Sequence, residues 1–266
     1  MSEDNGKYGR RAVILAGGKG TRLGPFTTIL PKPLLPIGDQ AILELVIDQL
    51  RACGFTRITL AVGYLSHLIE AVFGDGSAYG VSIDYHYEPL PLGTAGALAG
   101  IDALDEPFLM MNGDVITTLD FAELVDVHNR SGNALTIATQ TRTATIDFGV
   151  LTLADGEGPS RQIVEYLEKP KSDYCVSMGV YVVSPHLLRL IEPDAYLDFP
   201  DLVLQALAAD ELVGSYVYDG LWLDIGRHED YERAISATPD IATVLQRAAL
   251  ERAAATPPPA PAPAGD

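Results

Sequence analysis

Glycines and cations occur together in one segment at a spacing that suits phosphate binding. The stretch from Leu15 to Gly24 reads LAGGKGTRLG and includes Lys19 and Arg22. Glycines let backbone N–H groups approach an anion without obstruction by side chains, and the two cations add charge. The stretch is not a P-loop, because Gly-x-x-x-x-Gly-Lys-Ser/Thr is not matched around Lys19, and it is not the dinucleotide fingerprint, because Leu23 stands where the third glycine belongs. We favour a phosphate-binding loop; the alternative is a tight turn that merely needs glycine.

A lysine with a restricted backbone follows shortly afterwards. Pro31-Lys32-Pro33 fixes the chain on both sides of Lys32 and so limits where its ammonium can go. Other catalytic patterns are missing: the sequence has no Gly-x-Ser-x-Gly, no His-Glu-x-x-His and no cysteine cluster. A Ser-His-Asp hydrolase and a zinc enzyme are therefore not indicated.

The charge balance excludes some partners. The 266 residues include 36 acidic and 18 basic side chains, a net charge of −18. Such a surface repels nucleic acid and anionic lipid, and it accepts an anionic substrate only at a local group of cations or a metal. We also expect no membrane span, because the first apolar run, Ala12 to Ala16, is far too short. With two cysteines and no secretory leader, we expect a cytoplasmic protein.

The elements that must position these residues alternate between strand and helix in the first half of the chain. Apolar runs predict buried strands, and periodic apolar residues that end at glycine predict helices. The predicted strands are 11–16, 57–62, 81–87 and 108–111, and the predicted helices are 41–53, 66–73, 94–104 and one capped by Asp120. This alternation indicates a parallel sheet covered on both faces, with ligands outside the carboxyl ends of its strands.

The second half is richer in strands and should extend the sheet and add an antiparallel lid. Strands are predicted at 134–140, 148–153, 162–168, 176–183, 213–218 and 221–225, with two short helices before the last two. We expect a loose leader over residues 1–9, a single domain over 10–254 and a disordered Pro/Ala tail over 255–266. The apolar helical stretch from Ile241 to Ala254 packs on the domain or across a homodimer.

A series of motifs, in order, resembles the sugar-1-phosphate nucleotidylyltransferases, in their catalytic part. The likeness covers about residues 11 to 235 and rests on GGxGTRL at 17–23, PKP at 31–33, LGTAG at 92–96, NGD at 112–114, FGV at 148–150, EKP at 168–170, GVY at 179–181 and WLDIG at 222–226. The resemblance implies an α/β fold: a Rossmann-like three-layer sandwich with a mixed, mostly parallel central sheet and a small antiparallel lid. It also implies that a sugar phosphate attacks the α-phosphorus of a nucleoside triphosphate and that pyrophosphate leaves.

The resemblance also assigns roles to residues. Arg22 and Lys32 would hold the triphosphate and the leaving pyrophosphate, and Asp114 and Asp224 would hold Mg²⁺, which prefers oxygen ligands. The same aspartates could instead be turn formers or helix caps. The nucleotide-binding residues would be Leu15, Ala16, Gly17, Gly18, Gly20, Thr21 and Gly93, together with Arg22, Lys32 and Asp114. The sugar-phosphate-binding residues would be Asn112, Gly149, Glu168, Lys169 and Gly179.

The choice of base and sugar depends on finer similarity. The segments 61–66, 88–96 and 218–224 are most similar to mannose-1-phosphate guanylyltransferases, which favours GTP over thymidylyl, uridylyl or cytidylyl donors. The sugar could be mannose, glucose, an amino sugar, a heptose or a cyclitol. Two other classes stay open: a glycosyltransferase, which usually needs an Asp-x-Asp motif that is absent here, and a non-catalytic nucleotide-sugar sensor.

Overall fold

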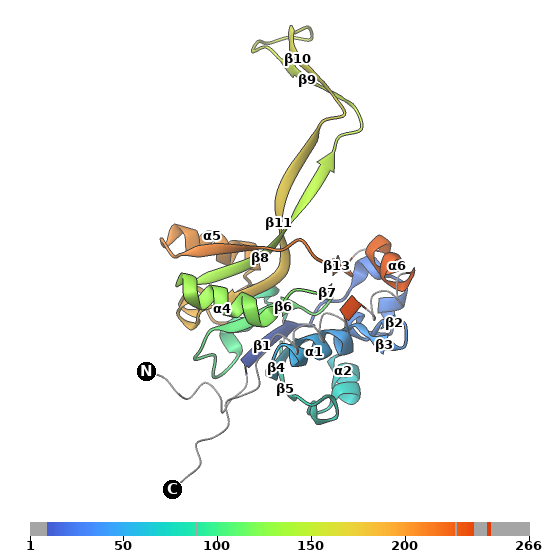
Figure 1. Ribbon diagram of the computed structural model, residues 1–266, viewed down its shortest axis with the longest axis vertical. Coiled ribbons are helices and arrows are strands. Elements are labelled where there is room, and N and C mark those ends of the chain that lie inside the picture. The colour runs from blue at the N-terminus through green and yellow to red at the C-terminus, as the bar shows by residue number, and fades with distance from the viewer. Residues whose placement is uncertain (1–9, 89, 227, 237–243, 246–266) are drawn as a thin grey trace.

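A seven-stranded mixed sheet forms the centre of the computed structural model (Figure 1), which describes residues 10–88, 90–226, 228–236 and 244–245. The strand order is β12-β8-β11-β6-β1-β4-β5. Within it, β11 runs antiparallel to β6 and β8, and the other neighbours pair in parallel. The strands are β1 (Arg10–Leu15), β4 (Phe55–Val62), β5 (Ser82–Tyr87), β6 (Phe108–Asn112), β8 (Leu135–Thr145), β11 (Lys171–Val183) and β12 (Val213–Val217). The predicted mixed, mostly parallel sheet is confirmed.

Helices cover both faces of this sheet and give three layers. On β1, Ala12 and Ile14 pack into one apolar cluster and Val13 into another, because successive strand residues point to opposite faces. Helices on the first face are α1 (Ile42–Ala52), α2 (Ser66–Phe73) and α4 (Phe121–Ser131). On the second face lie α3 (Gly93–Gly96), α5 (Phe199–Ala208) and the 3-10 helices η5 (Ala97–Gly100) and η6 (Pro185–Leu190). Asp120 caps α4 as predicted, since its carboxylate accepts hydrogen bonds from two backbone N–H groups of the first turn.

The predicted helix over 94–104 is shorter than expected. One α-helical turn, α3, is followed by the 3-10 turn η5, and the chain then extends at Ile101. Glycine explains this, because Gly96 and Gly100 lower helix propensity and both lie in tight contacts. A Cβ atom on Gly96 would lie 2.7 Å from the Ala195 carbonyl oxygen, and one on Gly100 would lie 2.6 Å from the His86 ring.

Two small antiparallel sheets support the region beyond the ends of β1 and β6. β2 (Pro36–Ile37) pairs with β3 (Gln40–Ala41), and β7 (Val115–Thr117) pairs with β13 (Trp222–Asp224). Helix α6 (His228–Ser236) packs beside them in a third apolar cluster that contains Leu23, Ile116 and Tyr231. The remaining 3-10 turns are η1 (Thr21–Leu23), η2 (Phe26–Thr28), η3 (Lys32–Leu34) and η4 (Ser77–Tyr79).

An antiparallel arm projects from the sheet (Figure 1). The second half of β8, from residue 141 on, and the first half of β11, up to residue 176, pair only with each other and form a two-stranded stalk. At its end β9 (Gly149–Leu153) and β10 (Ile163–Glu168) form a separate two-stranded sheet. We call residues 141–176 the arm. The predicted antiparallel addition is thus present, but it extends away from the body of the molecule.

Three predictions concern residues that the structure does not describe, in whole or in large part. The leader (1–9) and the tail (255–266) lie outside the described residues, as does the helix expected over 241–254 apart from residues 244–245. In the described part of the chain, no helix combines the length and apolar character needed to cross a bilayer.

Candidate functional site

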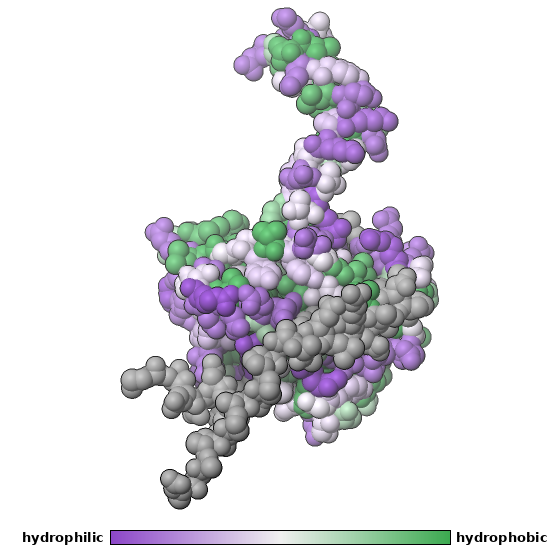
Figure 2. Space-filling view, in the orientation of Figure 1, coloured by the Kyte–Doolittle hydropathy of each residue, from purple (hydrophilic) through white to green (hydrophobic). Residues whose placement is uncertain are grey.

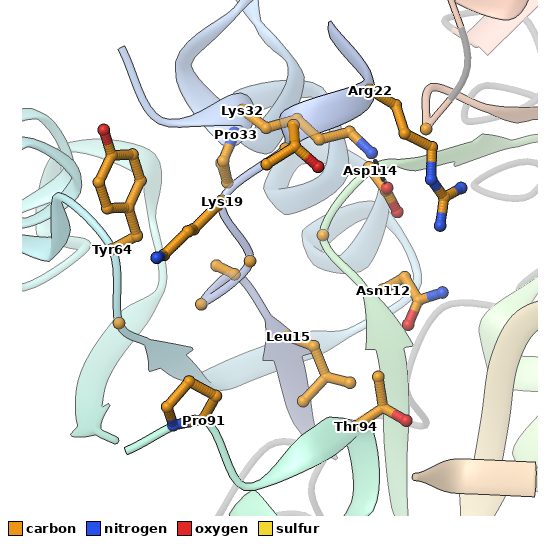
Figure 3. Close-up of a pocket in the computed structure, with 18 of the residues that line it drawn as sticks. Leu15, Lys19, Arg22, Lys32, Pro33, Tyr64, Pro91, Thr94, Asn112 and Asp114 are labelled. Carbon is orange, nitrogen blue, oxygen red and sulfur yellow. Dashed lines mark hydrogen bonds and ion pairs between the residues drawn. The ribbon is translucent and has the colours of Figure 1, made fainter. Parts of the chain in front are cut away.

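A cavity of about 900 Å³ opens where β1 and β6 end (Figure 3). This is the edge of a mostly parallel sheet at which ligands bind in such folds. The cavity is lined by twelve of the residues named from sequence: Leu15, Ala16, Gly17, Gly18, Gly20, Thr21, Arg22, Lys32, Gly93, Asn112, Asp114 and Asp224. The structure therefore brings the expected triphosphate-binding cations and both expected metal-binding carboxylates into one cavity.

Glycines shape the loop between β1 and η1 for two different reasons. Gly20 has φ +60°, and a Cβ atom there would lie 2.9 Å from Thr27 Cγ2 and 3.1 Å from Lys32 Cβ, so this glycine lets the loop close against Lys32. Gly18 has no such constraint, since a Cβ atom there would meet nothing within 4 Å. The fold does not need glycine at position 18, and the open space beside it is part of the cavity.

Lys32 and Asp114 form an ion pair in the lining of this cavity, beside Arg22 (Figure 3). Lys32 lies on η3, held between two prolines, and Asp114 follows the end of β6. The Lys32 ammonium donates to Asp114 Oδ2, whereas Asp114 Oδ1 is buried and makes no hydrogen bond in the structure. An unpartnered buried carboxylate oxygen is costly, so Oδ1 is a position where a ligand or cation would be stabilising.

Asp224 lies next to this pair because β13 runs beside β7. The register places Asp224 opposite Val115, and the Ile225 amide donates to the Asp114 carbonyl oxygen at 3.0 Å. Asp224 Oδ1 accepts a hydrogen bond from the Gly226 amide at 2.9 Å. A Cβ atom on Gly226 would lie 2.8 Å from Asp224 Oδ1 and 3.4 Å from Lys32 Nζ, so this glycine keeps the carboxylate and the ammonium close together.

The donor set fits a hard divalent cation. Two carboxylates border the same cavity, one of them with a buried free oxygen, and Mg²⁺ commonly takes one or two carboxylates and completes its shell with water and phosphate oxygens. Among the described residues, no group of three or more His, Cys, Asp or Glu side chains is placed to hold a metal by itself.

Glu88 is a cavity residue to which the sequence assigned no role. It follows β5, so its side chain lies at the same sheet edge as the loop after β1. Its Oε2 accepts from the Leu92 amide at 3.3 Å, and its Oε1 lies over Gly17, 3.1 Å from where a Cβ atom would be. Burial raises the pKa of the Glu88 carboxyl above its ordinary value. Its position directly after a predicted strand was the available sequence clue.

The residues expected to bind the sugar phosphate separate into two groups. Asn112 lines the cavity, and Gly179 (φ +73°) packs on it, since a Cβ atom there would lie 2.7 Å from Asn112 Nδ2. Gly149, Glu168 and Lys169 lie on the arm, away from the cavity lining. Their assignment to the sugar phosphate stays a prediction, because within one chain they do not border the cavity.

A local contact accounts for the glycine at position 149. Gly149 on β9 pairs with Glu168 on β10 in the two-stranded sheet at the end of the arm. The Tyr166 side chain lies over Gly149, and the Tyr166 hydroxyl donates to Glu168 Oε2 at 2.6 Å. A side chain on residue 149 would collide with the Tyr166 ring. This glycine therefore has a packing reason in the arm that the sequence motif alone did not indicate.

Comparison with known proteins agrees with this site. The family described as nucleotidyl transferase matches residues 11–240. Among curated relatives, a probable mannose-1-phosphate guanylyltransferase of Oryza sativa is 33% identical over 229 residues, and a mannose-1-phosphate guanylyltransferase of Mycobacterium tuberculosis is 33% identical over 226. These alignments cover 83% and 84% of this chain. The chain spans 62% of the length of each relative.

Solved structures share the fold. A putative glucose-1-phosphate thymidylyltransferase from Bacillus anthracis superposes with a TM-score of 0.68 at 24% identity, covering 87% of this chain and 96% of its own. HddC from Yersinia pseudotuberculosis gives a TM-score of 0.65 at 25% identity, covering 85% of this chain and 98% of its own. With the family match extending over nearly the whole described sheet, the chain belongs to the nucleotidyl transferase family.

Proposed function

We propose that this protein transfers a nucleotidyl group from a nucleoside triphosphate, preferably GTP, to a sugar 1-phosphate such as mannose 1-phosphate, releasing pyrophosphate. The observation that carries the proposal is the single cavity in which Arg22, Lys32, Asp114 and Asp224 meet beside a glycine loop. The relatives named mannose-1-phosphate guanylyltransferase support the choice of substrates.

The chemistry explains why these residue types are needed. A sugar phosphate is already an anion, so it attacks the α-phosphorus without a general base. The barrier lies in bringing several negative phosphates together, and fixed cations that hold them in line lower it. Lys32 binds the triphosphate next to Asp114, and Arg22, exposed on η1, adds a second cation to the same cavity. In a chain of net charge −18, such a local positive group is required for substrate binding.

Asp114 and Asp224 are the residues that would hold Mg²⁺. Asp114 would use its buried free Oδ1, and Asp224 would contribute the carboxylate that Gly226 orients. Bound there, the ion would neutralise charge on the triphosphate and on the leaving pyrophosphate. The chain's own contribution is to keep both carboxylates at one place through the β7–β13 pairing.

Glu88 supplies a reason for preferring guanine. A carboxylate presents two acceptor oxygens, and guanine presents two neighbouring donors, N1–H and the N2 amine. Glu88 lines the cavity beside Gly17 and accepts from the amide of Leu92, which directly precedes Gly93; Gly17 and Gly93 were expected to face the base and ribose. Uracil and thymine offer a single N–H donor on that edge and would leave one carboxylate oxygen without a partner.

The test is pyrophosphate release by the full chain with Mg²⁺ across a matrix of nucleoside triphosphates and sugar 1-phosphates. We expect turnover with GTP and mannose 1-phosphate to exceed that with UTP, dTTP or CTP. Turnover with another pair only would correct the substrate and keep the reaction class. No turnover across the matrix from folded protein, together with measurable nucleotide-sugar binding, would favour the non-catalytic sensor.

A further inference from the structure

One wall of the cavity rests on a segment from much later in the chain. We call residues 92–96 the cavity loop, because Gly93 and Thr94 line the cavity. Residues 195–198, which directly precede α5, are the support segment. Leu197 makes three backbone hydrogen bonds to the cavity loop, between 2.8 and 3.0 Å long. The support segment therefore fixes the backbone of this wall.

Asp198 has an unexpected set of hydrogen bonds for its place in the chain. It is the N-cap residue of α5, where an aspartate usually accepts from amides in the first turn of its own helix. Within the described chain, the Asp198 carboxylate makes no such bond. Its Oδ1 instead accepts from the Thr94 amide at 3.2 Å, and its Oδ2 accepts from the Tyr196 hydroxyl at 2.7 Å. The carboxylate thus binds the cavity loop rather than its own helix.

Thr94 takes over part of the capping that Asp198 leaves undone. The Thr94 hydroxyl accepts from the Phe199 amide, in the first turn of α5, at 2.7 Å. The cavity loop and the helix therefore hold each other through a reciprocal pair of hydrogen bonds. Another aspartate N-cap in this chain behaves in the ordinary way, since Asp120 accepts from two amides of its own helix, α4. The arrangement at Asp198 therefore depends on the cavity loop and not on the residue type alone.

Helix α5 gives this contact a fixed position. Its inner side chains, Phe199, Leu202 and Ala206, are buried in the second apolar cluster. Its outer side is open, with Leu204 and Leu207 63% and 53% exposed, and Figure 2 shows hydrophobic residues on the surface over α5. Because close packing on the sheet holds the helix from one side, Asp198 at its start is a rigid point of attachment for the loop.

The same loop holds the residue proposed to recognise the base. Glu88 Oε2 accepts from the Leu92 amide at 3.3 Å, at the start of the cavity loop. Next to Leu92, Gly93 has φ +80°, and a Cβ atom there would lie 3.0 Å from Asp198 Oδ1. The contacts to Glu88 and to Asp198 therefore fall within three consecutive residues. The phosphate-binding cations belong to other segments, η1 and η3, which have no part in these contacts.

We propose that Asp198 is a positioning residue for the nucleoside part of the nucleoside triphosphate. By accepting from the Thr94 amide, it holds the cavity loop where Glu88 and Gly93 meet the base and ribose. Asp198 acts through the loop, since it is not one of the described residues that line the cavity. The nature of the ligand rests on the proposed function.

Equilibrium binding of two ligands separates the nucleoside end of the cavity from the phosphate end. GTP and inorganic tripolyphosphate, which offers phosphates without a nucleoside, are each titrated into the full chain with Mg²⁺. Asp198→Ala should raise Kd for GTP about tenfold, the effect of losing one hydrogen bond to a charged group, and leave Kd for tripolyphosphate unchanged. Asp198→Asn keeps an acceptor for the Thr94 amide and should restore GTP binding to within about twofold of wild type.

Two further variants control for effects on the helix. Asp201→Ala removes the same charge from the first turn of α5, where Asp201 is exposed, and should leave both dissociation constants within about twofold of wild type. Asp198→Gly should repeat the binding pattern of Asp198→Ala at less cost to folding, because glycine is accepted at N-cap positions. It keeps the test decisive if Asp198→Ala does not fold.

Several results would overturn the inference. Equal weakening of GTP and tripolyphosphate in the variants without the carboxylate would show a general loss of the cavity. Unchanged GTP binding in these variants, or an equal loss in Asp198→Asn or Asp201→Ala, would show that the contact to Thr94 does not position the nucleoside. A wild-type protein that binds no nucleoside triphosphate and has no turnover would contradict the proposed function instead, so the two failures are distinguishable.

Discussion

The loop after β1 and the arm were both expected to touch the substrates, yet they differ in what fixes them in place. β1 lies between β4 and β6 and is covered on both faces, so its end has one position. The outer parts of β8 and β11 pair only with each other, and their side chains are exposed. A motif at the end of a central strand is therefore placed by the sheet, whereas a motif on a projecting ribbon is placed by what the ribbon contacts.

The largest effect should come from the aspartates. Asp114→Asn and Asp224→Asn should each lower turnover about 10²-fold or more, because both remove charge from the proposed metal site. The fold should be unaffected, since Asn keeps the shape of the side chain. Steady-state pyrophosphate release together with thermal unfolding measures both quantities.

An arm carboxylate provides the control for those variants. Asp173 is exposed, and its Oδ1 accepts a hydrogen bond from the Thr143 hydroxyl at 2.6 Å within the stalk. Asp173→Asn should leave turnover within about twofold of wild type. Equal losses for Asp173→Asn and Asp114→Asn would contradict the distinction between the cavity and the arm.

The arm should act on one substrate only. Lys169→Ala should raise KM for sugar 1-phosphate about tenfold and leave KM for the nucleoside triphosphate unchanged, because one cation is removed from one phosphate. Two-substrate kinetics resolves the two constants. Unchanged kinetics for Lys169→Ala would show that the arm has no part in the catalytic cycle.

Two glycines that line the cavity should differ in what their substitution affects: one should affect ligand binding and the other the stability of the fold. Gly18→Ala should leave the unfolding temperature unchanged, since its Cβ meets nothing within 4 Å, but should weaken triphosphate binding about tenfold. Gly93→Ala should instead destabilise the protein by about 1–2 kcal/mol, because position 93 has φ +80° and a Cβ there would lie 2.5 Å from the Leu197 carbonyl oxygen. Calorimetry and equilibrium nucleotide binding measure the two effects; a less stable Gly18→Ala protein would refute the assignment.

Glu88 should set the preference for the base. Glu88→Gln should raise KM for GTP several-fold relative to UTP, since the amide offers one acceptor where the carboxylate offers two. Burial raises the pKa of the Glu88 carboxyl, so this group becomes protonated at a higher pH than an exposed glutamate does. The wild-type preference for GTP should therefore already weaken at that higher pH as the pH is lowered. The ratio of kcat/KM for GTP and UTP between pH 8 and pH 5 measures this. A ratio that changes neither with pH nor with the substitution would exclude Glu88 from base recognition.

The smallest expected effect concerns the free energy of unfolding and a histidine that packs against the parts of β8 and β11 that lie in the central sheet. His128 is buried on α4, with its ring nitrogens hydrogen-bonded to Thr136 and Ser184, and burial lowers its pKa. The folded state resists protonation, so the stability that this histidine contributes is present above the unfolded pKa of about 6.5 and is lost as pH falls below it. The loss is up to about 1.4 kcal/mol per pH unit.

Urea unfolding at pH 7.5 and pH 5.5 measures that loss. The difference between the two pH values should be smaller in His128→Gln, which has no proton to gain there. An identical difference in both proteins would show that another group is responsible.

Short motifs predicted the cavity well because they sit at ends of buried strands. Asn112-Gly113-Asp114 follows β6, and the glycine loop follows β1, so pairing between these neighbours brings them together. Asp224 needed more than strand periodicity, since the three-residue β7 directly after Asp114 was not predicted, and β7 is what holds β13 in place. Only the family resemblance brought Asp224 to the metal site.

Other features depended on contacts that a single sequence does not reveal. The position of Glu168 and Lys169 depends on whether the ribbon that carries them bends, projects or meets another copy. Glu88 entered the prediction only as part of the segment 88–96, and it received no role of its own because sequence similarity does not show which side chain of a segment lies in a cavity. The early end of the helix at Gly96 depends on a contact with Ala195, about a hundred residues away in sequence.

Phosphorus NMR of the full chain with GTP, mannose 1-phosphate and Mg²⁺ tests the central claim most directly. The account predicts that GTP and mannose 1-phosphate decline together while a nucleoside diphosphate sugar and pyrophosphate appear in equal amounts. The Asp114→Asn/Asp224→Asn double variant should produce neither product. Formation of GDP and inorganic phosphate instead, or equal product formation by the double variant, would contradict it.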